Sequence, residues 1–171
     1  VELLVAILIM AVIAGTAIML FGGVLSSSRE KADDETAENI KRAILTYMNM
    51  SNDVDLSCLG LKGDDSSDNL IKRLSCVITI EDDSVTFTPP ANVEDFSAPK
   101  VESPTIDASD IKGEFGPFLD ASKDMSPKTP GTKGWEVNID EKTQVIIVSA
   151  AKNEEDCVVA FADDTDGGSG G

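Results

Sequence analysis

The sequence of 171 residues contains no histidine and few basic or aromatic side chains. Without histidine, the chain lacks the usual general base and the commonest protein ligand of transition metals. Acidic residues outnumber basic residues 31 to 14, which gives a net charge of −17 at pH 7. Because affinity for nucleic acid depends on Lys and Arg neutralising phosphates, we do not expect direct binding of nucleic acid along this acidic surface.

Patterns typical of catalysis are also missing. The chain has no glycine-rich phosphate loop and no Ser–His or Cys–His pair. Acidic doublets such as Asp33-Asp34 and Asp82-Asp83 are expected by chance in a chain this acidic. Because Asp and Glu side chains are usually exposed, we expect these doublets to lie on the solvated surface. The sequence therefore predicts a protein that is not an enzyme and that needs no cofactor.

Cysteine is scarce, and its spacing matches no zinc or redox motif. In an exported domain, three cysteines are expected to form one disulfide and leave one thiol. We predict a Cys58–Cys76 disulfide, which closes a short loop and would contribute about 3 kcal/mol. Pairing of either residue with Cys157 is a close alternative, because connectivity cannot be deduced from sequence.

What the chain does have is a long apolar run at its start. Residues 3–25 contain no charged side chain, and Glu2 stands at the head of the run. Roughly 20 apolar residues span a bilayer as one helix, and a lone carboxylate beside such a segment marks a functional contact. The run is too long for a cleavable secretory signal, and no basic residue precedes Arg29.

The string Val-Glu-Leu-Leu-Val-Ala-Ile-Leu-Ile-Met, residues 1–10, resembles the N-terminus of type IV pilins and of the pseudopilins of type II secretion. The resemblance is specific over these residues, looser to Leu25 and absent from the rest of the chain. The family pattern has three residues, typically beginning with phenylalanine, ahead of the segment that matches Val1-Glu2. They are missing here, through either a late start of the sequence or processing at an unusual site.

The resemblance implies a subunit that waits in the cytoplasmic membrane of a bacterium. The pilus assembly machinery then packs identical copies into an extracellular filament, and the apolar helices form its core. Glu2 is expected to pair with the terminal amine of a neighbouring subunit. The other residues expected on the assembly surface are Leu3, Leu4, Ile7, Leu8 and Val12. The alternatives are a pseudopilin and a membrane-tethered binding module that never polymerises.

We predict that the helix continues beyond the apolar run to about residue 50, where Asn52 and Asp53 signal its end. Residues 29–42 are good helix formers without proline. Apolar residues then recur at spacings of three and four, as on one helix face. These are Ala32, Ile40, Ala43, Ile44, Tyr47 and Met48. Such a helix is roughly 75 Å long, and a head domain would cover its second half.

Three glycines, Gly15, Gly22 and Gly23, interrupt the apolar run. Each costs about 1 kcal/mol relative to alanine in a helix. Small residues also permit close helix packing in a membrane. Because bacterial pilins lose helicity in a comparable region, the resemblance implies that this segment loosens during assembly.

Residues 51–171 predict a β-rich head with acidic loops. The predicted elements are a helix at 69–74, capped by residues 66–68, and strands at 76–80, 84–88, 135–139, 144–149 and 157–161. Tight turns between successive strands favour an antiparallel sheet, with one face covering the helix. The predicted fold is α+β, a long helical spine packed by an antiparallel β-sheet head, and is pilin-like.

Residues 91–133 are rich in Pro, Ser, Asp and Gly, and too long for a structureless loop in a compact domain. We expect this segment to wrap the head. The apolar residues expected to pin it are Phe96, Ile106, Phe115, Phe118 and Leu119. The tail, residues 163–171, is flexible by composition.

Two further patterns give weaker predictions. Asp164 and Asp166 are candidate Ca²⁺ ligands, although the spacing and the closing glutamate of an EF-hand are missing. Asn49-Met50-Ser51 fits the N-glycosylation pattern at the predicted end of the helix.

Overall fold

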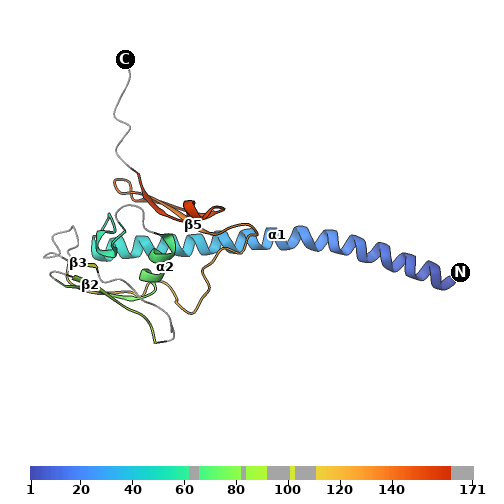
Figure 1. Ribbon diagram of the computed structural model, residues 1–171, viewed down its shortest axis with the longest axis horizontal. Coiled ribbons are helices and arrows are strands. Elements are labelled where there is room, and N and C mark those ends of the chain that lie inside the picture. Colours follow the sequence, from blue (N-terminus) through green and yellow to red (C-terminus); the bar gives the residue numbers. More distant parts are fainter. Residues whose placement is uncertain (62–65, 82–83, 92–100, 103–110, 163–171) are drawn as a thin grey trace, which may run out of the picture.

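The computed structural model describes residues 1–61, 66–81, 84–91, 101–102 and 111–162. Its main feature is α1, a single helix of 50 residues from Glu2 to Ser51. The N-terminal half of α1 projects far beyond the head, which surrounds only the C-terminal half (Figure 1). The predicted unbroken spine to about residue 50 is confirmed.

The two halves of α1 have opposite surroundings. The large apolar side chains of the first 25 residues are exposed. In the second half, Ile40, Ile44 and Tyr47 are fully buried, and Ala43 and Met48 nearly so. The predicted stripe is therefore confirmed over these five residues. It is wrong at Ala32, which is exposed, while the adjacent Asp33 is buried in its place.

The end of α1 is set by the backbone of Asn52. This residue adopts the left-handed conformation, with φ of 59°, and its N–H donates to the carbonyl of Met48 at 2.9 Å. Asparagine is one of the few residues that accepts this conformation readily, and a left-handed residue commonly terminates a helix. The predicted exit at Asn52 is confirmed.

The head is built from short elements. In the described residues these are η1 (Ser57–Leu59), α2 (Ser67–Leu74), β1 (Val77–Glu81), β2 (Ser84–Thr88), β3 (Val101–Glu102), β4 (Gly113–Phe115), β5 (Gly134–Asp140), β6 (Val145–Ala151), η2 (Glu154–Asp156) and β7 (Val159–Phe161). The side chain of Ser66 accepts from the N–H of Asp68 at 3.2 Å, so the predicted cap of α2 is confirmed. Both predicted hairpins form, β1 with β2 and β5 with β6.

The strands form two sheets where the sequence predicts one antiparallel sheet. One has the order β3-β2-β1-β4 and the other β6-β5-β7. β7 runs parallel to β5, with Val159 opposite Val137. The path of the chain explains this direction. β6 ends beside the start of β5, where Ala151 pairs with Gly134, and η2 then takes the chain to the other edge of β5. Because β7 begins near the start of β5, it runs in the same direction as β5.

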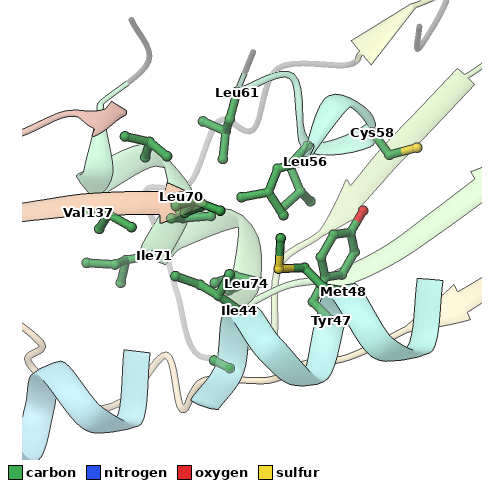
Figure 2. Packing of buried hydrophobic residues seen from close by; sticks show 14 of the residues in the cluster. Ile44, Tyr47, Met48, Leu56, Cys58, Leu61, Leu70, Ile71, Leu74 and Val137 are labelled. Atoms are coloured by element: carbon green, nitrogen blue, oxygen red, sulfur yellow. The ribbon is translucent and has the colours of Figure 1, made fainter. Parts of the chain in front are cut away.

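The core lies between the two sheets and around α1. Figure 1 shows β5 on one side of α1 and β2 and β3 on the opposite side. Ile44 of α1, Leu70 and Leu74 of α2 and Val137 of β5 belong to one core cluster, part of which Figure 2 shows. Neither hairpin could bury its apolar face alone, so the helix supplies the common core.

A segment that we call the strap, residues 116–133, crosses from β4 to β5 over α1 and α2. The N–H groups of Phe118 and Leu119 both donate to the carbonyl of Leu74, at 2.9 and 3.1 Å. The Phe118 ring meets Tyr47 edge-on at 5.9 Å between centroids. Of the predicted pins, Leu119 is buried and Phe115 and Phe118 are half-buried. Phe96 and Ile106 lie outside the described residues.

Asp33 fastens the strap to α1. Its carboxylate accepts the N–H of Lys128 at 2.5 Å and the N–H of Thr129 at 2.9 Å. Although burial acts to raise the pKa of this carboxyl, the two N–H donors hold the pKa below its usual value. The prediction that the Asp33-Asp34 doublet is solvated surface is wrong for Asp33, which is 6% exposed, and right for Asp34.

Replacing Asp33 by alanine should lower the free energy of unfolding of the head by roughly 1–3 kcal/mol, because two N–H groups of the strap lose their acceptor. The measurement is a urea titration in detergent followed by the fluorescence of Trp135, the only tryptophan. Asp34→Ala is the matched control and should stay within about 0.5 kcal/mol of the wild type, as exposed substitutions do. Equal stability of both variants would show that the strap is held elsewhere.

Candidate functional site

The most distinctive surface of the molecule is the bare N-terminal half of α1. The predicted assembly residues Leu3, Leu4, Ile7, Leu8 and Val12 are between 60 and 79% exposed. Exposed apolar side chains continue through Phe21 to Leu25. A soluble monomer rarely exposes a continuous apolar surface of this size, so such a surface marks contact with lipid or with another protein.

The chain contains one helix, in the described residues, that is long and apolar enough to cross a membrane. None of its most apolar window is buried by the head. The apolar surface is therefore separate from the core of the head. The length and composition of the N-terminal half of α1 are thus those of a helix that can cross a membrane.

Glu2 lies in the first turn of α1 and is exposed. A carboxylate at this end favours the helix, because the N–H groups of the first turn carry partial positive charge. Within the described residues, no ammonium or guanidinium group lies within 4.0 Å of Glu2. The side chain is thus available for a partner outside its own chain.

The three glycines of the apolar run lie within an unbroken helix. A Cβ atom added at Gly15, Gly22 or Gly23 would meet nothing within 4 Å. No contact inside one chain therefore requires glycine at these positions, and any such requirement would arise from a neighbour. Their loosening during assembly stays a prediction.

At the other end of α1, a buried polar network holds the turn into the head. The Tyr47 hydroxyl donates to Asp53 Oδ2 at 2.7 Å. The same carboxylate accepts the N–H of Ser57 at 3.0 Å and the N–H of Cys58 at 3.0 Å. Figure 2 shows the Tyr47 hydroxyl directed towards the segment that contains Leu56 and Cys58. Sequence analysis assigned Asp53 only to the helix exit and missed this role.

Asp53 is fully buried, and its chemistry differs from that of the surface carboxyls. Burial raises the pKa of Asp53 to about 6, with a smaller contribution from neighbouring Asp55, while the bonds from Tyr47 and Cys58 oppose the rise. Burial likewise raises the pKa of Tyr47 well above its ordinary value. The network therefore sets the geometry of the helix exit, and a proton can bind there near pH 6.

The predicted Cys58–Cys76 disulfide is not present, because all three cysteine sulfurs are free. Cys58 lies in η1, whereas the Cys76 thiol faces the carbonyl of Lys72 at the end of α2. Burial raises the pKa of Cys58 to about 12 and of Cys76 to about 11, so both thiols are poor nucleophiles.

The predicted Ca²⁺ and glycosylation sites stay predictions. Asp164 and Asp166 lie outside the described residues. Over the described part of the chain, no three His, Cys, Asp or Glu residues are grouped so that they could hold a metal ion. Asn49 is exposed on α1, but the Ser51 hydroxyl of the same motif is buried and donates to the Tyr47 carbonyl at 2.8 Å.

Comparisons of the chain with protein-family models, with curated proteins and with solved structures gave no match. The features of the molecule that point to a function are the bare apolar half of α1, Glu2 at its tip and the acidic head.

The raised pKa of Asp53 predicts an unusual pH dependence of stability. Between the ordinary value of 3.8 and about 6, the folded state holds a proton that the unfolded state has released. The free energy of unfolding should therefore fall as pH rises through this window, by about 1.4 kcal/mol per pKa unit and roughly 3 kcal/mol in all.

The measurement is a series of urea titrations between pH 4 and pH 7. Asp53→Asn should remove the slope in this window, whatever it does to stability at one pH. Glu155→Gln is the control, because Glu155 is exposed in η2 and does not contribute to the shift. A slope that persists in Asp53→Asn would place its origin elsewhere.

Proposed function

We propose that the chain is a pilin, the structural subunit of an extracellular type IV pilus. The observation that carries the proposal is the bare apolar half of α1, which projects from a folded, acidic head and ends in an exposed carboxylate. Such a subunit can be stored in a membrane and later polymerise through the same surface. The likeness of residues 1–10 to the pilin N-terminus supports this assignment.

Assembly would be driven by burial of the apolar surface. In a filament, the segments from Leu3 to Leu25 of many copies would pack together and leave both lipid and water. Burial contributes about 25 cal/mol per Å² of apolar area, which makes this the main cohesive energy outside the cell. The heads, which carry most of the −17 charge, would form the solvated exterior.

Glu2 would set the axial register of the helices. A carboxylate in an apolar bundle carries a large penalty unless a positive group pairs with it. The terminal amine of a neighbouring subunit is the partner implied by the resemblance. Only a stagger that brings the two groups together avoids the penalty, so one register is selected.

Two other functions use the same helix differently. A pseudopilin would form short fibres within a secretion machine, and abundant long surface filaments would argue against it. A membrane-tethered binding module would use α1 only as an anchor, stay monomeric in detergent-free bilayers and tolerate loss of Glu2. The position of Glu2 at the head of an otherwise uncharged run favours polymerisation over simple anchoring.

Replacing Glu2 by alanine should abolish filaments or reduce their yield at least tenfold, because the register loses its charge pair. Membrane insertion should be unchanged, since the apolar run remains. The measurement is filament yield by electron microscopy beside membrane fractionation. Glu155→Ala, an exposed carboxylate in η2, is the control. Normal filaments from Glu2→Ala would rule out the register role.

A further inference from the structure

The head carries an open groove of about 370 Å³ between α2, the strap and the start of β5. Its walls include the apolar side chains of Ile71, Met125 and Trp135. Lys72, Lys123 and Lys133 also line it. Three lysines at one hollow stand out in a chain with only 14 basic residues.

Two of these lysines form no ion pair within the described residues, although Lys123 lies near enough to Asp120 to help lower the pKa of that carboxyl. The acidic residues at the groove are already engaged, because Asp68 pairs with Lys72 at 2.6 Å and Asp124 pairs with Lys128. In the described part of the chain, no carboxylate lies within 4.0 Å of the ammonium groups of Lys123 and Lys133. We call these two residues the basic rim.

Exposed negative charge lies on α1, just beyond the apolar run. Glu30 and Asp34 are exposed and four residues apart, so they lie on one face of the helix. Like charges at this spacing repel. Glu38 continues the face but already pairs with Lys41 and Arg42, whereas Glu30 and Asp34 form no ion pair within the described residues. We call Glu30 and Asp34 the acidic face.

We infer that the basic rim of one subunit binds the acidic face of α1 in a second copy. The inference rests on the proposed function, because bundling of the apolar helices would bring heads that carry most of the −17 charge together. Such heads repel unless opposite charges meet locally. Two different patches that complement each other give a head-to-tail contact, and head-to-tail contacts that do not close into a ring produce helical filaments.

Charge reversal in the full-length chain tests this contact. Lys123→Glu with Lys133→Glu, or Glu30→Lys with Asp34→Lys, should each reduce filament yield at least about tenfold. The four substitutions combined should restore the yield. Lys142→Glu with Lys152→Glu makes the same charge change at residues that do not line the groove, and should assemble normally. Trp135 fluorescence identifies any variant whose head is misfolded.

Zero-length carbodiimide cross-linking provides a readout that does not depend on filaments. Wild-type chains with and without ¹⁵N label are mixed in vesicles of bacterial phospholipid. Linked peptides that join the basic rim of one label to the acidic face of the other are expected, about tenfold above links from Lys142.

The outcomes separate the contact from the proposed function. Filaments without such links, and unchanged assembly of the rim variant, would overturn the contact and leave the pilin proposal standing. Links without filaments would support the contact and contradict the pilin proposal.

Discussion

Exposing a long apolar helix to water is unfavourable, because each Å² of apolar surface left uncovered costs about 25 cal/mol. The head covers only the face of α1 that carries Ile40 to Met48, and leaves the first 25 residues bare. The rest of the molecule follows from that division. The covered half provides the core on which two small sheets and α2 assemble, and the bare half is long and apolar enough to cross a membrane.

The head holds α1 through polar contacts at both ends of the covered segment. Asp33 ties the strap to the helix a few residues beyond the bare half, and Asp53 holds the turn where the helix ends. Between them the apolar stripe provides most of the burial. An acidic surface surrounds this core, so the head stays solvated whatever the bare half contacts. In the proposed filament, the apolar half of α1 would hold the subunits together, and the acidic head would keep the filament surface solvated.

Local patterns in the sequence were enough to predict α1, its exit at Asn52 and both hairpins, because each depends on residues close in the chain. Contacts between distant segments were not predictable. The bond from Lys128 to Asp33 joins residues 95 positions apart, and an acidic doublet gives no sign of which member is buried. The parallel pairing of β7 likewise depends on how η2 directs the chain. The length and composition of residues 3–25 were enough to predict an exposed apolar surface, whereas the role of Glu2 stays a prediction.

The most direct test of the central claim is cryo-electron microscopy of the full-length chain after detergent removal. The account predicts a helical filament in which the segments from Leu3 to Leu25 are bundled at the centre, the acidic heads lie outside, and Glu2 lies beside the amine of a neighbouring chain. Chains that remain as single helices in lipid, with no filament, would contradict it and leave a membrane-tethered head as the better description.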